Sequence, residues 1–266
     1  MRQRKPVQML LAFYGSMVVD QDTGPIPATL LLETLEGAGV APATTRASLN
    51  RMASRGLLSR IKTGRSIAYE LTDTGAQLLR EAAGRVNRAR PFDPLGSGWT
   101  LVTFSVPEGQ RTLRHRLRAT LTWAGFAPLR DGLWVAPGAV DLHAALHPLH
   151  EELPAGTLTA FIAQELEGFG MGDAVGAAWD LESIRRAHDD FAAEWREPST
   201  PECEVPAMTH RTALVADWLA LLRADPGLPP AYLGENWPSD GSTSLFRTLR
   251  TELEAPSNAE LNSRIG

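Results

Sequence analysis

The hydrophobic pattern of the N-terminal region changes abruptly from a helical period to an extended one. Three apolar segments have helical spacing, and the second and third begin at a proline and end at a glycine. These helices are expected at residues 7–19, 27–37 and 42–56. Two short extended runs follow, at residues 57–62 and 67–71, and Thr63-Gly64-Arg65 between them predicts a hairpin with a glycine at its tip. Three helices followed by a hairpin is the order of a winged helix-turn-helix domain.

The rest of the chain divides at a segment rich in proline and glycine, RPFDPLGSG, which predicts a domain boundary. Beyond it the pattern is strand, helix, strand, strand, helix, strand, the ferredoxin-like βαββαβ order, with the second helix at about 140–152. The last third predicts helices near residues 174–195, 208–223 and 243–254. We therefore expect an α+β protein with three domains. They are an N-terminal winged helix-turn-helix domain (1–92), a central ferredoxin-like domain (97–172) and a mainly helical C-terminal domain (173–266).

The charge of the chain is divided unevenly between these parts. Residues 1–92 carry 13 Lys and Arg against 7 Asp and Glu, a net charge of +6, whereas the remaining residues carry 13 against 24, a net charge of −11. Residues 37–69 contain six basic side chains and no acidic one. A merely solvated surface usually mixes both signs, so this pattern favours a nucleic-acid partner. A basic surface that binds another protein remains an alternative.

The predicted helix at 42–56 has a thin polar face made mostly of small residues. Thr45, Leu49, Met52 and Ala53 share the opposite side and are expected to pack inward. Such a face fits the major groove, where an asparagine suits adenine and an arginine suits guanine. Basic residues at the hairpin are expected at phosphates or in the minor groove. The predicted DNA-binding residues are Thr44, Arg46, Ser48, Asn50, Arg51, Arg55, Lys62 and Arg65.

Several segments resemble one known family, the phenylacetate-catabolism repressors (PaaX-like regulators). The resemblance covers TTRASLNRMASRGLLSRIKTGRSIAYELTDTG, then WTLVTFSVPEGQRTLRHRLRATLTWAGFAPLRDGLWVAP, and finally AWDL and DPGLPPAYLGENWP. It implies a homodimeric repressor of an aromatic-acid catabolic operon. It also implies release from DNA by an aryl-CoA thioester, typically phenylacetyl-CoA, as an effector rather than a cofactor. The middle segment also resembles CRISPR-associated endoribonucleases, but TFSVPE lacks the aspartate that metal-dependent cleavage by such enzymes requires.

An effector site is expected in the central domain. Arg111, Arg114 and Arg118 recur at helical spacing and suit the phosphates of a CoA-type effector, and Trp123 or Trp134 would line an aryl pocket. The same arginines also fit contacts with the DNA backbone, ion pairs across a dimer interface, or a solvated face with salt bridges.

Other patterns predict no catalytic or metal-binding residue. The histidines at 143, 147 and 150 have helical spacing, but Pro148 interrupts them and a fourth ligand is missing. The glycines of EGFGMGD lack the rest of a phosphate-loop motif. We therefore expect a non-enzymatic, cytoplasmic protein without a membrane segment. The alternative is an enzyme that processes nucleic acid or acyl-CoA and uses the winged helix for targeting.

Overall fold

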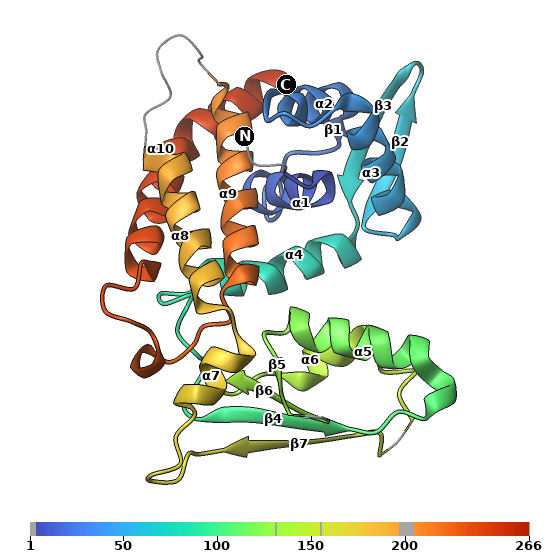
Figure 1. The fold of residues 1–266 in the computed structure, drawn as a ribbon. Helices are drawn as coiled ribbons and strands as arrows, with labels where there is room; N and C mark the ends of the chain where they lie inside the picture. The colour runs from blue at the N-terminus through green and yellow to red at the C-terminus, as the bar shows by residue number, and fades with distance from the viewer. Residues whose placement is uncertain (1–3, 131, 155, 197–204, 266) are drawn as a thin grey trace. The chain divides into compact units, whose positions relative to one another are not determined.

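The protein is described by a computed structural model that covers residues 4–130, 132–154, 156–196 and 205–265. It is an α+β protein with two small antiparallel sheets (Figure 1). Its contacts form two compact units, and each unit combines segments that are distant in sequence. Unit 1 comprises Met1–Ala89, Asp190–Leu221 and Asp240–Gly266, and unit 2 comprises Arg90–Asp189 and Leu222–Ser239.

The N-terminal part of unit 1 has the expected order of three helices and a hairpin. In chain order its elements are α1 (Pro6–Met17), β1 (Ile26–Pro27), α2 (Ala28–Gly37), α3 (Pro42–Ser54), β2 (Leu58–Thr63), β3 (Ser66–Leu71) and α4 (Asp73–Val86). The sheet order is β1-β3-β2, with Ile26 opposite Tyr69. The strand β1 was not predicted, because two residues are too few to show an alternating pattern.

The core of this part is built around α1. Met9, Leu10, Phe13 and Tyr14 are fully buried, and Met17 is 2% exposed. A helix that is apolar on most sides must be surrounded by other elements to be stable in water. The helices α2, α3 and α4 supply part of that cover.

C-terminal helices complete unit 1. They are the later residues of α8 (Leu181–Arg196), most of α9 (Ala207–Ala224) and α10 (Ser239–Ile265). Trp218 of α9 stacks on Phe246 of α10 with ring centroids 4.2 Å apart. The buried Arg211 of α9 donates to the Ser16 carbonyl oxygen at 2.6 Å, beside the C-terminus of α1.

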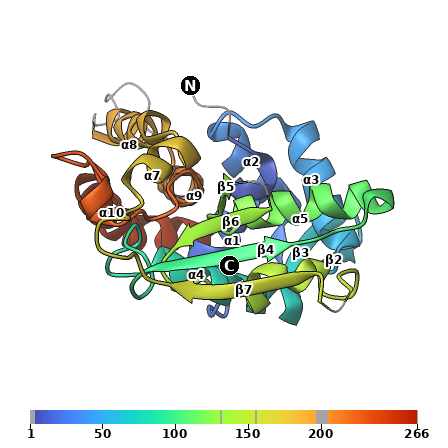
Figure 2. The same ribbon diagram turned by 60° about the horizontal axis from the view of Figure 1, so that its bottom comes forward.

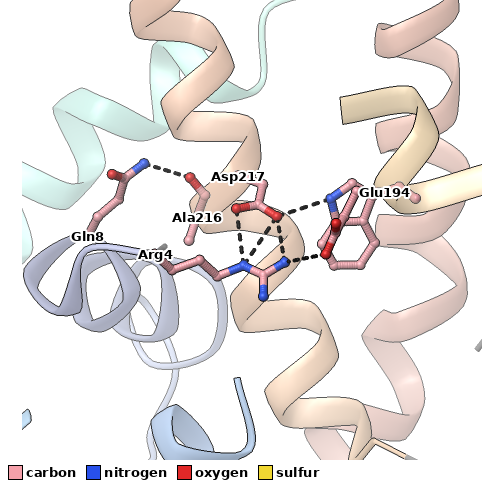
Figure 3. A network of polar contacts seen from close by, with 6 residues as sticks. Arg4, Gln8, Glu194, Ala216 and Asp217 are labelled. Atoms are coloured by element: carbon pink, nitrogen blue, oxygen red, sulfur yellow. Dashed lines mark hydrogen bonds and ion pairs between the residues drawn. The ribbon is translucent and has the colours of Figure 1, made fainter. Parts of the chain in front are cut away.

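A buried ion pair joins the start of the chain to α9 (Figure 3). Nε and Nη2 of Arg4 donate to the Asp217 carboxylate at 3.1 and 2.7 Å, and Nη2 also donates to Glu194 at 3.1 Å. The indole N–H of Trp195 donates at 3.2 Å to Oδ2 of Asp217, the oxygen that also accepts from Nη2 of Arg4. Burial lowers the pKa of Arg4, but the two carboxylates outweigh it and the pKa is raised. Gln8 adds a hydrogen bond to the Ala216 carbonyl oxygen at 2.6 Å.

Unit 2 is built on a four-stranded sheet in which every neighbouring pair is antiparallel. Its elements are β4 (Trp99–Phe104), α5 (Arg111–Trp123), β5 (Ala127–Arg130), β6 (Leu133–Pro137), α6 (Leu142–Leu146) and β7 (Leu158–Ala163). The strand order is β5-β6-β4-β7 (Figure 2). Leu117 and Leu121 of α5 pack with Val102 and Trp134 on one sheet face. The helix expected at 140–152 is shorter, because Pro148 lacks the N–H that an α-helix needs and a 3₁₀ turn replaces it.

The other sheet face is covered by α7 (Gly172–Ala178), the first turns of α8 and the segment 225–238. The single helix predicted near 174–195 is wrong. The backbone of Trp179 is extended, and Asp180 caps a new helix by accepting from the Ser183 N–H at 2.9 Å. The helix α10 is much longer than the predicted 243–254 and contains Pro256.

The segment expected to be a linker, residues 90–98, is packed in unit 2. Phe92 is 5% exposed and lies edge-on to the His188 ring, with the centroids 4.6 Å apart. His188 in turn pairs with Asp225 at 2.9 Å.

Over the part of the chain that the structure describes, no helix is long and apolar enough to cross a membrane.

Candidate nucleic-acid interface

The helix α3 separates its residues into an inward and an outward face. Thr45, Leu49 and Met52 are 2% exposed or less, as the helical spacing predicted. Proline at the first turn starts the helix, and Gly56 follows its end with a φ of +70°, a conformation that favours glycine. Both ends of α3 are therefore defined by the sequence, and its inward side chains are packed in the core.

Most of the predicted DNA-binding residues lie on the outward side. The exposed ones on this helix and directly after it are Thr44, Arg46, Asn50, Arg51 and Arg55. Ser48 is different, because it is 2% exposed. It lies three residues after Thr45 and four before Met52, which places it on the inward face. We therefore remove Ser48 from the set of groove contacts.

The hairpin carries its basic residues on exposed positions. Lys62 lies opposite Ile67, and Thr63 opposite Ser66 closes the ladder. Gly64 at the tip has a φ of +62°, and Arg65 beside it is exposed. Arg60, which was not among the predicted site residues, is also exposed and lies opposite Tyr69. Its two-residue spacing from Lys62 on a strand is the signal that identifies it.

The cations of this surface have no carboxylate partners among the residues that the structure describes. This holds for all six basic residues of 37–69, namely Arg46, Arg51, Arg55, Arg60, Lys62 and Arg65. Other arginines of unit 1 are paired: Arg80 with Asp20 at 2.8 Å, and Arg264 with Glu33. We call these six residues the basic surface. It presents positive charge on a rigid helix and its neighbouring hairpin.

Hydrogen bonds fix the hairpin to the helices on either side of it. The Thr72 hydroxyl donates to the Gly56 carbonyl oxygen at 2.6 Å and accepts from the Gly75 N–H at 3.1 Å. Thr72 thus caps α4 while holding the turn that follows α3. Its N–H also donates to the Leu57 carbonyl oxygen at 3.3 Å. Thr72 therefore helps to set the orientation of the hairpin relative to α3 and α4.

Two buried tyrosines support the polar face from behind. The Tyr69 hydroxyl donates to Asn50 Oδ1 at 3.2 Å, and the Tyr14 hydroxyl donates to the Tyr69 carbonyl oxygen at 3.2 Å. Burial raises the pKa of Tyr14, and the neighbouring Tyr69 raises it further. The local pattern had not identified either tyrosine, since their contacts join residues far apart in sequence.

The residues expected to bind an effector differ in exposure and in their contacts. Trp134 is 7% exposed and packs near Phe104 in the core of unit 2, whereas Trp123 is 65% exposed with Arg223 4.7 Å from its ring centroid. Arg114 donates to the Val106 carbonyl oxygen at 2.6 Å. Arg111 and Arg118 are exposed on α5. The burial of Trp134 removes it from any surface that a ligand reaches in this conformation.

The described residues contain no group of three or more His, Cys, Asp or Glu side chains that could hold a metal ion. Of the three spaced histidines, His147 and His150 have ring centroids 6.3 Å apart. The glycine-rich EGFGMGD segment forms a turn in which Leu166 bridges to Phe169.

Comparison with known proteins gives three consecutive family matches. Residues 6–75 match the family described as PaaX-like protein, residues 93–174 match the PaaX protein central Cas2-like domain, and residues 179–263 match the PaaX-like protein C-terminal domain. Together these matches extend over most of the chain.

One curated relative and one solved structure extend this likeness. The chain is 26% identical over 242 residues to the transcriptional repressor PaaX of Escherichia coli (strain K12), covering 86% of this chain and 74% of that protein. It is similar in fold to the uncharacterized protein Rv0674 from Mycobacterium tuberculosis. The TM-score is 0.58 at 21% identity, over 96% of this chain and 98% of the other. The second likeness concerns the fold alone.

Proposed function

Since the chain belongs to the PaaX-like protein family, we propose that it is a transcriptional repressor that binds operator DNA through the basic surface. Similarity to a transcriptional repressor supports the coarser statement that it is a DNA-binding regulator. The name of that relative describes a repressor rather than an enzyme, so we propose a binding function and no catalytic one.

The observation that carries the proposal is the set of six exposed cations on α3 and the hairpin, which lack carboxylate partners among the described residues. DNA phosphates attract such a surface, and the release of their counterions drives binding. The acidic remainder of the chain is repelled by the same polyanion, which favours one orientation of approach.

The residues of the basic surface then have different roles in a winged helix-turn-helix. The helix α3 would enter the major groove, with Asn50 and Arg51 at base edges and Thr44 and Arg46 beside them. Lys62 and Arg65 would contact the backbone or minor groove at the hairpin, and Arg55 and Arg60 would add phosphate contacts. The helix would specify sequence, and the hairpin would mainly add affinity.

We further propose that two copies bind the half-sites of a palindrome as a homodimer, and that an aryl-CoA thioester releases them from a catabolic operon. Two-fold symmetry in a dimer matches two-fold symmetry in an operator. An effector acts only through its different affinities for the DNA-competent and DNA-incompetent states. This regulation rests on the resemblance to the phenylacetate-catabolism repressors. The placement of the predicted effector residues does not identify a pocket for it.

The test is a binding titration with DNA from upstream of the protein's own gene. Binding is monitored by fluorescence anisotropy, and the titration is repeated at a series of salt concentrations. We expect affinity to fall steeply as salt rises, and aryl-CoA thioesters to release the DNA. An affinity for that DNA no higher than for an unrelated duplex would refute the repressor function. A protein with no salt-dependent affinity for any duplex would refute DNA binding.

A further inference from the structure

Asn50 is exposed on α3, yet one end of its side-chain amide is held from within the protein. The Tyr69 hydroxyl donates to its Oδ1 at 3.2 Å. Tyr69 is 4% exposed, so its ring is held by packing against other side chains. An exposed polar side chain is thereby hydrogen-bonded to a buried one.

Tyr69 is itself held on several sides. It lies in β3 between two paired strands, opposite Ile26 of β1 and Arg60 of β2. Its carbonyl oxygen accepts from the fully buried Tyr14 hydroxyl at 3.2 Å. The position of the Tyr69 hydroxyl is therefore determined by the core of unit 1.

The orientation of an asparagine amide decides what it recognises. Its oxygen accepts and its nitrogen donates, and the two ends have nearly the same shape, so an unheld amide presents either one. With Oδ1 turned to Tyr69, Nδ2 and its two N–H groups remain for a base. Guanine N7 and O6, adenine N7 and thymine O4 accept hydrogen bonds in the major groove, whereas cytosine presents an amino donor there.

We propose that Tyr69 is a positioning residue that makes Asn50 read its base as a hydrogen-bond donor, so that cytosine is the base most strongly rejected at this position. The proposal rests on the DNA-binding function above. The sequence analysis matched an asparagine with adenine. In a two-bond contact with adenine, Oδ1 would have to accept from the adenine amino group as well as from Tyr69, so the structure favours a contact made by Nδ2 alone.

The experiment uses the full-length protein and a duplex that the wild-type protein selects from random DNA. Affinities are measured for every single-base change in one half-site, at fixed salt. Wild type should disfavour cytosine by about fivefold or more at one position. Asn50→Ala and Tyr69→Phe should each lose that preference at the same position, and the double variant should lose no more than either single variant.

Thr34→Val is the control, because it removes a buried hydroxyl of unit 1 whose hydrogen bond, to the Leu30 carbonyl oxygen, lies within α2. It should lower thermal stability in a similar way to Tyr69→Phe but keep the rejection of cytosine. The salt dependence of all these variants should equal that of wild type, since no phosphate contact is removed.

Four results would overturn the proposal. Tyr69→Phe with an unchanged base preference would show that the tyrosine does not position Asn50, and equal relaxation by Thr34→Val would show a general loosening of unit 1 instead. Asn50→Ala with unchanged preferences would remove Asn50 from base reading while DNA binding stands. Wild type without salt-dependent DNA affinity would instead refute the proposed function and the positioning role together.

Discussion

Gly75 in α4 lies so close to Leu57 that a Cβ added to it would stand 2.2 Å from the Leu57 carbonyl oxygen. The two residues meet where the hairpin ends and α4 begins, beside the cap formed by Thr72. This contact requires a residue without a side chain. It also sets how closely α4 approaches the end of α3.

Gly75→Ala should therefore destabilise the protein by about 1–3 kcal/mol, because backbone atoms have to move to relieve the overlap. Chemical denaturation measures this loss. Gly84→Ala is the control, since a Cβ at Gly84 of the same helix meets nothing within 4 Å. That change should stabilise the helix by about 0.5–1 kcal/mol. Equal effects of the two substitutions would contradict the close contact.

Arg51→Ala and Lys62→Ala should weaken DNA binding in different ways. Arg51 is exposed on the outward face of α3, and its loss should cost about 1–3 kcal/mol at the operator and relax base choice at one position. Lys62 lies on the hairpin, and its loss should weaken all duplexes alike and reduce the salt slope by about one. Anisotropy titrations of operator and unrelated DNA measure both effects. Operator binding that survives both substitutions would contradict the groove assignment.

Arg4→Met should raise the pKa of His210. Burial lowers this pKa from its ordinary value of 6.5, and the positive charge of Arg4 lowers it further. The folded state thus favours the neutral form of His210. As the pH falls below the pKa that His210 has in the unfolded chain, the unfolded chain binds the proton more readily and the free energy of unfolding decreases. NMR titration of the histidine ring measures the shift. Arg264→Met removes an arginine that pairs with Glu33 instead, and should leave His210 unchanged.

Glu165 should contribute to stability in neutral solution but not in acid. Burial acts to raise its pKa, but hydrogen bonds from Tyr232, Trp99 and the Met171 N–H outweigh this and lower it below 4.5. A depressed carboxylate pKa gives stability that is present above the unfolded value and is lost as the pH falls through the folded one. The difference in unfolding free energy between wild type and Glu165→Gln should therefore shrink below about pH 4.5. A difference that is constant from pH 7 to pH 3 would contradict this assignment.

In the N-terminal part of unit 1, the three helices and the hairpin were predictable because their signals lie within short windows. Leu49 and Met52 fall on the inward side of α3 by spacing alone, and Gly64 marks the hairpin tip. Ser48 was misplaced because a serine is small and polar enough to suit either side of a helix. Its burial follows from position, three residues after Thr45, and not from its chemistry.

Contacts between distant segments could not be predicted from one sequence. Nothing near Tyr69 indicates that its hydroxyl meets Asn50, 19 residues away, and nothing near Arg4 indicates Asp217. The predicted helix at 243–254 stops before Pro256, yet α10 continues through that proline. Phe92, in a segment typical of a linker, is buried by residues from two later parts of the chain.

Because α10 supplies part of unit 1, the order of synthesis on the ribosome matters for folding. Phe246 covers Trp218, and Ser257 and Asn258 accept hydrogen bonds from Nη1 of the buried Arg211. A nascent chain that ends before Ser239 has already made every residue of the basic surface but none of these covering groups. The residues of the basic surface are therefore synthesised early, and the groups that complete the packing of their unit are synthesised last.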